Sequence, residues 1–150
     1  MEAGSPFGAA VGLSAIVAVD QLLKGLVSHF LPPGYTMALL PGVLALTHVR
    51  NPGIAFGLRV HISPLIPAAV ALTGVFLLFY NSARWTQTRS ARVALVLVSG
   101  GALGNLIDRL RVGAVIDYID LHVWPVFNLA DAAVTIGAVV FLLALVRGSR

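Results

Sequence analysis

The sequence predicts an all-α membrane protein, with four transmembrane helices and a small extracytoplasmic strand-bearing element between helices one and two. Composition is the first reason: 58% of the 150 residues are hydrophobic, only 11% are charged, and the mean hydropathy is +0.92. A soluble domain carries about a quarter charged residues. The second reason is that four apolar stretches are long enough to cross a bilayer. The third is a connection rich in Pro and Gly after the first stretch.

Each predicted span contains about the 20 apolar residues that the hydrocarbon core of a bilayer requires. No charge lies between residues 62 and 83 or between residues 93 and 107, and Asp131 is the only charge between residues 123 and 146. The spans must be helical, because lipid offers the backbone no hydrogen-bond partner. We expect a single integral membrane domain over residues 1–150, with spans at about 7–28, 62–82, 92–110 and 125–146.

The connection between the first two predicted spans, residues 29–61, differs from the spans in character. It is rich in Pro and Gly and contains alternating apolar stretches such as residues 43–49. Structureless loops of that length are uncommon inside a compact domain, and alternation bounded by turn residues is typical of strands. We therefore expect a small strand-bearing or interfacial element here.

Arginine placement predicts the orientation in the membrane. The short loop between spans two and three carries Arg84, Arg89 and Arg92, and Arg147 and Arg150 follow span four. Cytoplasmic loops are enriched in Lys and Arg, so we place this loop and both termini on the cytoplasmic side. The pI near 10.4 then indicates anchoring at lipid headgroups, and no nucleic-acid partner is expected.

Polar residues gather at one depth in this topology. A spacing of three or four residues places two side chains on one face of a helix. Carboxylates within a span are costly and indicate a functional site. The alternative is structural, because buried polar side chains also hold membrane helices together, and the acid and base of span one could form only an ion pair. The pairs at the outer ends of three spans are Asp20 with Lys24, Asn105 with Asp108, and Asn128 with Asp131.

Several hydrolytic chemistries do not fit the residues of the chain. It has no Cys, which removes thiolate metal sites and Cys nucleophiles. The four His residues are scattered over connecting segments without metalloprotease spacing, and none lies within a span to activate Ser99. Two carboxylates that share a proton need none of these groups, because the ionised one activates water and the neutral one donates to the scissile carbonyl. No metal and no cofactor is expected.

Environment favours Asp117 and Asp131 as this pair. Asp117 has no adjacent base and is surrounded in sequence by apolar residues, an environment that raises a carboxyl pKa. Asp131 lies in a similarly apolar stretch, one turn from Asn128, which could orient it by a hydrogen bond. The residues alone do not show that the two carboxylates meet.

Asp108 is the alternative member of the pair, and Asp120 is a weaker candidate. Asp108 is followed by Arg109 and lies one turn from Arg111. These cationic neighbours would hold it ionised, which suits a structural or substrate-orienting role better than a catalytic one.

Four motifs carry a family resemblance: "VDQLLK", "NPGIAF", "GGALGNLIDRLRVGAVIDYID" and "FNLAD". In this order, across nearly the whole chain, they resemble lipoprotein signal peptidase, also called signal peptidase II. The resemblance implies an intramembrane aspartyl endopeptidase with four spans, which removes signal peptides from diacylglyceryl-modified bacterial prolipoproteins by cutting before the lipidated cysteine. It also implies catalytic roles for Asp117 and Asp131 and supporting roles for Asp20, Lys24, Asn51, Gly53, Asn105, Asp108, Arg109 and Asn128.

The resemblance further implies the partners and the location. We expect a prolipoprotein substrate, with a lipobox peptide and a diacylglyceryl cysteine, and contact with membrane lipid. The chain is expected to be a monomer in the bacterial cytoplasmic (inner) membrane, multi-pass, with both termini cytoplasmic and the active site toward the outer face. The 14 positions from Asp117 to Asp131 are fewer than in many members, which concerns the outer segment that covers the substrate.

Two other classes of function remain open on the residues alone. In a small transporter or proton-conducting protein, Asp20, Lys24, Asp108 and Asp131 would form a relay. Against it, the inner halves of the last three spans carry no ionisable group. A non-catalytic assembly factor would tolerate Asn at both members of the predicted pair.

Overall fold

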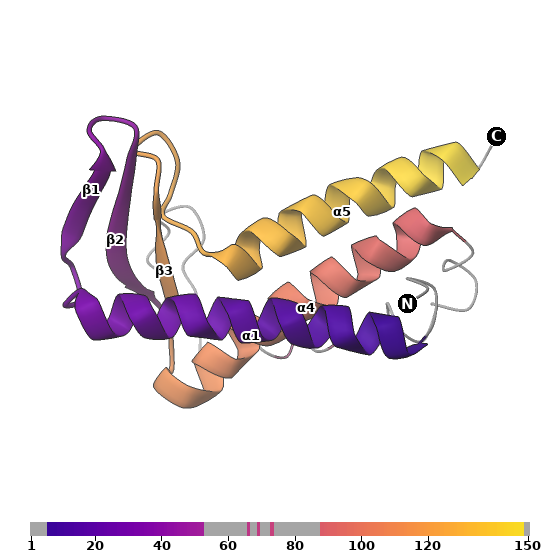
Figure 1. Cartoon of the computed structure of the whole chain (residues 1–150), viewed down its shortest axis with the longest axis horizontal. Helices are drawn as coiled ribbons and strands as arrows, with labels where there is room; N and C mark the ends of the chain where they lie inside the picture. Colours follow the sequence, from indigo (N-terminus) through magenta and orange to yellow (C-terminus); the bar gives the residue numbers. More distant parts are fainter. Residues whose placement is uncertain (1–5, 53–65, 67–68, 70–72, 74–87, 149–150) are drawn as a thin grey trace.

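The computed structural model describes residues 6–52, 66, 69, 73 and 88–148. The predicted span at 62–82 lies outside these residues, except for Ile66, Ala69 and Thr73, which are helical. The described elements are three long helices and the three strands of one sheet (Figure 1). In chain order they are α1 (Pro6–Phe30), β1 (Thr36–Leu40), β2 (Leu44–Asn51), α4 (Arg89–Val112), β3 (Val115–Asp120) and α5 (Leu129–Gly148).

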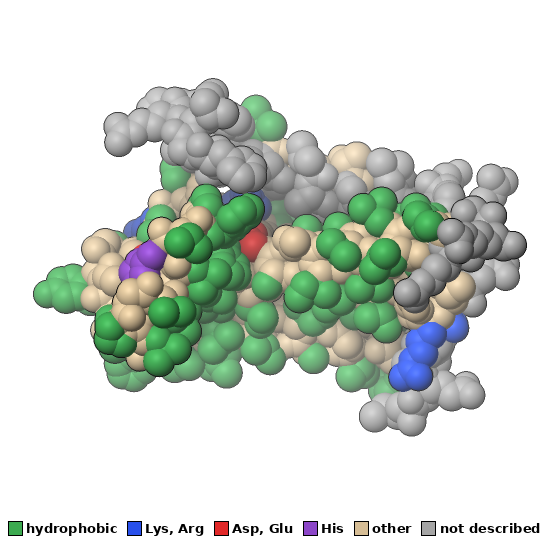
Figure 2. Space-filling model, turned by 90° about the horizontal axis from the view of Figure 1, so that it is seen from above, with side chains coloured by type: hydrophobic (Ala, Val, Ile, Leu, Met, Phe, Trp, Pro, Cys, Tyr) green, Lys and Arg blue, Asp and Glu red, His purple; other side chains and the backbone are tan. Residues whose placement is uncertain are grey.

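The three described helices confirm three of the predicted spans, since each is long and apolar enough to cross a membrane. Large apolar side chains such as Leu22 and Val146, each 61% exposed, lie on their outer surfaces. Figure 2 shows hydrophobic side chains spread along the helices, as expected of a surface in contact with lipid. α5 begins at Leu129, later than the predicted residue 125, because Asn128 caps it.

The strand-bearing element predicted between the first two spans is confirmed by β1 and β2. They form an antiparallel hairpin whose turn contains Gly42 at φ +73°. The expectation of an otherwise all-α chain is corrected by β3, which pairs antiparallel with β2 and follows α4 in the chain. Gly113 makes this possible: at φ +74° it donates its N–H to the Arg109 carbonyl and ends α4, so that the chain turns toward β2.

The sheet lies across one end of the helices, with its strands running crosswise to the helix axes (Figure 1). The last turns of α1 and α4 and the first turn of α5 meet at this end. All three polar pairs predicted at one depth lie there, because Asp20 and Asn105 are late in their helices and Asp131 is early in its own.

Glycines let α4 approach both neighbouring helices closely. A Cβ atom on Gly104 would lie 2.6 Å from the Asp20 Oδ2 on α1, and a Cβ atom on Gly101 would meet the carbonyl oxygen of Ala130 on α5. Small residues at helix contacts are common in membranes, where close packing is a main source of association. The glycines of α4 therefore bring the polar groups of three helices within hydrogen-bonding distance.

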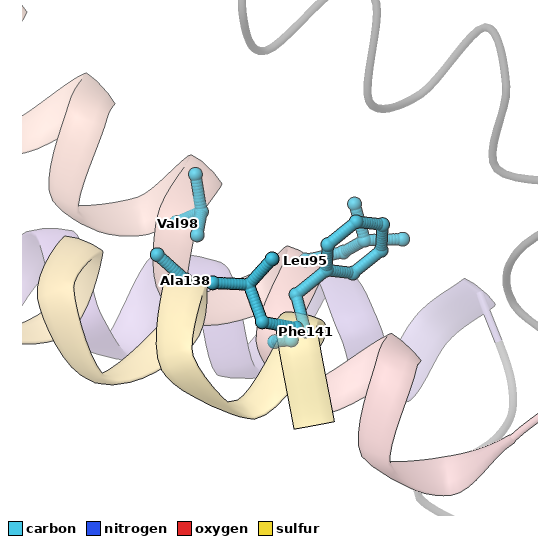
Figure 3. Close-up of a pocket in the computed structure, with 6 residues that line it drawn as sticks. Leu95, Val98, Ala138 and Phe141 are labelled. Carbon is cyan, nitrogen blue, oxygen red and sulfur yellow. The ribbon is translucent and has the colours of Figure 1, made fainter. Parts of the chain in front are cut away.

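A cavity of about 270 Å³ lies between α4 and α5, in the halves of these helices away from the sheet. Figure 3 shows Leu95 and Val98 of α4 beside Ala138 and Phe141 of α5. A lining without polar groups offers no acid, base or hydrogen-bond donor for hydrolysis, so the functional site has to be sought at the sheet end. The residues that line the cavity are Ala94, Leu95, Val98, Ala138, Phe141 and Leu142.

Candidate active site

α5 begins with a reciprocal cap between Asn128 and Asp131. The Asn128 Oδ1 accepts the Asp131 N–H at 2.8 Å, and the Asp131 Oδ2 accepts the Asn128 N–H at 3.3 Å. This arrangement is a capping box, in which two backbone donors at a helix start are satisfied by side chains. The tetrapeptide NLAD therefore starts the helix and orients the Asp131 carboxylate at the same time.

The next two N–H groups of α5 also find partners. The Leu129 N–H donates to the Tyr118 hydroxyl at 3.3 Å, and the Ala130 N–H donates to the Asp20 Oδ1 at 3.0 Å. The first N–H groups of a helix have no partner within the helix, and leaving them bare where water is scarce costs free energy. Groups from α1 and β3 thus stabilise the start of α5.

Asp117 lies on β3 and is only 2% exposed. Its Oδ1 accepts a hydrogen bond from the Asn128 Nδ2 at 2.7 Å, and its Oδ2 accepts one from the Asn51 Nδ2 at 3.1 Å. Burial, followed by the nearby charge of Asp131, raises the pKa of Asp117 from 3.8 to about 7, and the hydrogen bonds from Asn51 and Asn128 oppose this rise. A carboxyl with that pKa is partly neutral at neutral pH.

Two amide side chains join Asp117 to Asp131. The Asn105 Nδ2 donates to the Asp131 Oδ1 at 2.7 Å. The Asn128 Nδ2 donates to the Asn105 Oδ1 at 3.1 Å as well as to Asp117. The two carboxylates favoured by the sequence are therefore held together by one hydrogen-bonded bridge, and Figure 2 shows an acidic surface in the recess between the sheet and the helices.

Lys24 is buried, 1% exposed, at the centre of the supporting residues. Its Nζ lies 2.8 Å from the Asp20 Oδ2, 2.8 Å from the Asp108 Oδ2 and 2.9 Å from the Asn105 Oδ1. The ion pair that was the structural alternative for Asp20 and Lys24 is present, and Lys24 also pairs with Asp108 on α4. Because the Asn105 oxygen accepts from Lys24, its amide nitrogen must face Asp131, so the lysine sets the orientation of one bridging amide.

Asp108 has a cationic partner that was not expected from its neighbours in the sequence. Within the described part of the chain its ion pair is with Lys24, whereas the Arg109 Nη1 donates to the Asn105 carbonyl at 3.4 Å and the Arg111 side chain donates elsewhere. Successive helix residues point about 100° apart, so Arg109 does not face the same way as Asp108. Lys24, which is far away in the sequence, therefore forms the ion pair with Asp108, and the charge of Arg109 also interacts with this carboxylate.

Asp108 also bonds the backbone of β3. Its Oδ2 accepts the backbone N–H of Ile116 at 3.1 Å, and Ile116 directly precedes Asp117 on β3. The carboxylate at the end of α4 thus fixes the start of the strand that carries Asp117.

Arg109 and Asn51 also lie at the site, while Gly53 lies outside the described residues. The Arg109 guanidinium is close enough to Asp131, Asp117 and Asp108 to interact with their charges. Asn51 ends β2. It donates to the Asp117 Oδ2, whereas Asn128 donates to the Asp117 Oδ1. Of the ten residues predicted from the sequence, nine are therefore brought together at the sheet end of the helices.

Two further residues belong to this cluster and were not predicted. The Gln21 Nε2 donates to the Asp108 Oδ1 at 2.9 Å, and the Tyr118 hydroxyl accepts the first N–H of α5. Both directly follow a predicted site residue in sequence, Asp20 and Asp117, and adjacency was the only available signal. Among the described residues, no three His, Asp or Glu side chains form a group that could hold a metal ion.

Comparison with known proteins decides the family. A family model described as signal peptidase (SPase) II matches residues 13–147. The chain belongs to the signal peptidase II family. It is therefore an aspartic peptidase, and its apolar helices agree with a multi-pass protein of a bacterial membrane.

Three similar proteins align with most of this chain. A lipoprotein signal peptidase of Moorella thermoacetica is 38% identical over 125 residues, which are 83% of each protein. One from Syntrophomonas wolfei is 44% identical over 138 residues, covering 90% of this chain and 91% of the relative. A bacterial membrane enzyme solved by the in meso method has a TM-score of 0.88 at 28% identity, over 96% of this chain and 90% of that one.

Proposed function

We propose that this chain removes signal peptides from diacylglyceryl-modified prolipoproteins by cutting the peptide bond before the lipidated cysteine, with Asp117 and Asp131 as the catalytic pair. The relatives named lipoprotein signal peptidase support the substrate class. The bridge that Asn105 and Asn128 form between the two carboxylates supports the assignment of the pair. No cofactor takes part in the proposal.

In the proposed reaction Asp117 is the acid and Asp131 is the base. Asp117 is the more buried of the two, and its pKa of about 7 leaves a neutral fraction that can donate a proton to the scissile carbonyl oxygen. Asp131 accepts a proton from water, and the water oxygen attacks the carbonyl carbon to give a tetrahedral diol. Asp131 then gives its proton to the amide nitrogen, and a diol hydroxyl returns a proton to Asp117 while the carbon–nitrogen bond breaks. The products are a carboxyl group and an amine, and the pair regains its starting protonation state.

The remaining residues position the substrate and the pair. Arg109 offers a planar fork of N–H donors beside both carboxylates, where it can bind a peptide carbonyl of the substrate. Asn51 at the end of β2 bonds Asp117, where it can contact an extended peptide. Gly53, two positions later in the sequence, is assigned a supporting role by the resemblance alone. Asp20, Lys24 and Asp108 form the ionic support beneath the bridge.

The fourth span and the orientation also belong to the proposal. The first described segment ends beside the catalytic pair, where Asn51 bonds Asp117, and the chain resumes at Thr88, which caps the far end of α4. We propose that the charge-free residues 62–82, which are long enough for a membrane helix, form the fourth span. We place the sheet on the outer face and both termini in the cytoplasm of a monomeric, single-domain protein.

The test is single-turnover cleavage of a diacylglyceryl-modified prolipoprotein by purified variants in detergent or lipid. Asp117→Asn and Asp131→Asn keep the side-chain shape but remove the titratable proton, so each should fold and lose turnover. Because the two carboxyls act as a unit, the double variant should be scarcely slower than either single variant. Melting curves of the same samples separate lost chemistry from lost fold.

Asp108→Asn is the matched control, because it changes a carboxylate of the same cluster that has a structural role. It should lower thermal stability, or reduce activity with some cleavage remaining. Cleavage by well-folded Asp117→Asn together with none by well-folded Asp108→Asn would move the pair to Asp108 and Asp131. A wild-type protein that conducts protons but cleaves no lipidated substrate would favour the transporter instead.

A further inference from the structure

Gln21 on α1 forms hydrogen bonds to two carboxylates that surround Lys24 and to the backbone of α4. Its Nε2 lies 2.9 Å from the Asp108 Oδ1, 3.1 Å from the Gly104 carbonyl oxygen and 3.3 Å from the Asp20 Oδ2. All three are acceptors, so the amide nitrogen has to face them, and the opposite orientation would place oxygen against oxygen. The Gln21 Oε1 accepts from the Arg111 Nη1 at 3.2 Å on the outer side, which agrees with this orientation.

The contact with Asp108 matters because that carboxylate is held at both oxygens. Lys24 and the Ile116 N–H donate to its Oδ2, and Gln21 donates to its Oδ1. The Ile116 carbonyl in turn accepts from the Asn128 Nδ2 at 3.3 Å. Without Gln21, the second oxygen of a carboxylate that is 3% exposed would lose this donor, and the carboxylate could rotate away from the Ile116 N–H.

We propose that Gln21 is a positioning residue for the catalytic pair: it locks Asp108, which holds the backbone directly before Asp117 and keeps the Asp117 carboxylate against Asn128. This inference rests on the proposed peptidase function and extends it to a residue that neither the motif resemblance nor the sequence argument assigns. Gln21 has no contact with the two carboxylates of the pair in the described structure and acts through Asp108.

Two substitutions test the hydrogen bond from Gln21 to Asp108 in single-turnover cleavage. Gln21→Met keeps the length of the side chain and removes the donor, so cleavage should slow about tenfold, the effect expected for one lost hydrogen bond to a charged group. Gln21→Glu keeps the shape but turns an acceptor toward Asp20, Asp108 and the Gly104 carbonyl. It should be slower still at neutral pH and recover relative to Gln21→Met as the pH falls, because a protonated Glu regains a donor.

Arg111→Gln is the matched control, since it removes the outer partner of Gln21 and leaves the donation to Asp108 in place. It should cleave at close to the wild-type rate, as should Leu22→Met at an exposed neighbouring position. The inference is overturned if Gln21→Met cleaves like the wild type. It is also overturned if the rate of Gln21→Glu relative to Gln21→Met is the same at every pH while both melt lower than the wild type, which is the behaviour of a purely structural residue.

Different results would contradict the proposed peptidase function and the proposed role of Gln21. If the wild type does not cleave a lipidated prolipoprotein, the proposed function is wrong. If the wild type cleaves, Asp117→Asn does not, and Gln21→Met is as fast as the wild type, only the role of Gln21 is wrong.

Discussion

At the scale of single residues, the cluster is organised by matching donors to acceptors. Asn128 illustrates this: its oxygen caps α5, and its amide nitrogen bonds Asp117, Asn105 and the Ile116 carbonyl. A buried amide with every group used cannot change orientation without leaving several partners unmatched. The positions of the Asp117 and Asp131 carboxylates are thereby set by a neighbour whose own orientation is fixed.

The raised pKa of Asp117 predicts how stability depends on pH. The folded protein binds this proton up to about pH 7, whereas the unfolded chain releases it near pH 3.8. Between these values the folded state binds more protons, so the free energy of unfolding should fall as the pH rises. Asp117→Asn has no proton to lose, and it should gain stability over the wild type as the pH is raised from about 4 to about 7.

Melting temperatures of the two proteins across this pH range measure the effect. A difference that stays constant with pH would mean that Asp117 titrates at its ordinary value, and the assignment of Asp117 as the acid would lose its support. Asp120→Asn is a useful comparison, because hydrogen bonds from the His122 N–H and Thr47 lower the pKa of this carboxyl, so its variant should not reproduce the trend.

The residues show what sequence could and could not predict about the site. Asp117 and Asp131 were predicted from apolar surroundings, which are a local property visible in the chain. The partner of Asp108 was not, because Lys24 lies on another helix and contacts depend on how helices pack. Gln21 was missed for the same reason: a polar residue on an apolar helix does not reveal which neighbour it faces.

At the scale of elements, two nearly identical tetrapeptides perform different tasks. NLAD at residues 128–131 starts α5, where its first and last residues cap the helix. NLID at residues 105–108 lies near the end of α4, where its Asn supports Asp131 and its Asp fixes β3. The difference comes from position, because only a helix start has backbone N–H groups to be capped.

Gly104 allows a test of the close approach between α1 and α4. A Cβ atom there would lie 2.6 Å from the Asp20 Oδ2, so Gly104→Ala should push the helices apart, lower the melting temperature and slow cleavage. Gly25→Ala is the matched control, because a Cβ atom on Gly25 meets nothing within 4 Å. That variant should be as stable as the wild type or gain about 0.5–1 kcal/mol from better helix propensity. Equal behaviour of the two variants would contradict the packing argument.

Among the elements, the helices were predictable and β3 was not. Long charge-free stretches indicate spans directly, because the bilayer sets their length. β3 is short, contains two Asp residues among six positions, and follows a helix after a single left-handed glycine. Its pairing with β2 joins segments that are far apart in the sequence, and no local pattern reports such a contact.

At the scale of the whole molecule, the orientation predicted from arginine placement can be tested by labelling. The chain has no Cys, so single cysteines can be introduced without a background. Ser90→Cys lies at the exposed start of α4 and should react with a membrane-impermeant thiol reagent only from the cytoplasm. Tyr35→Cys, at a position that is 64% exposed before β1, should react only from the outside. The reverse pattern would place the catalytic pair on the cytoplasmic face.

The cap at the start of α5 has a consequence for how the protein is made. Chains are synthesised from the N-terminus, and Asp131 lies at the start of the last described helix. Asp20 and Tyr118 bond the first N–H groups of that helix, and Asn105 bonds Asp131 itself. A nascent chain without α5 lacks Asp131, which is one member of the proposed pair. If Asp117 and Asp131 are the catalytic pair, cleavage should therefore begin only after the start of the last described helix has been synthesised.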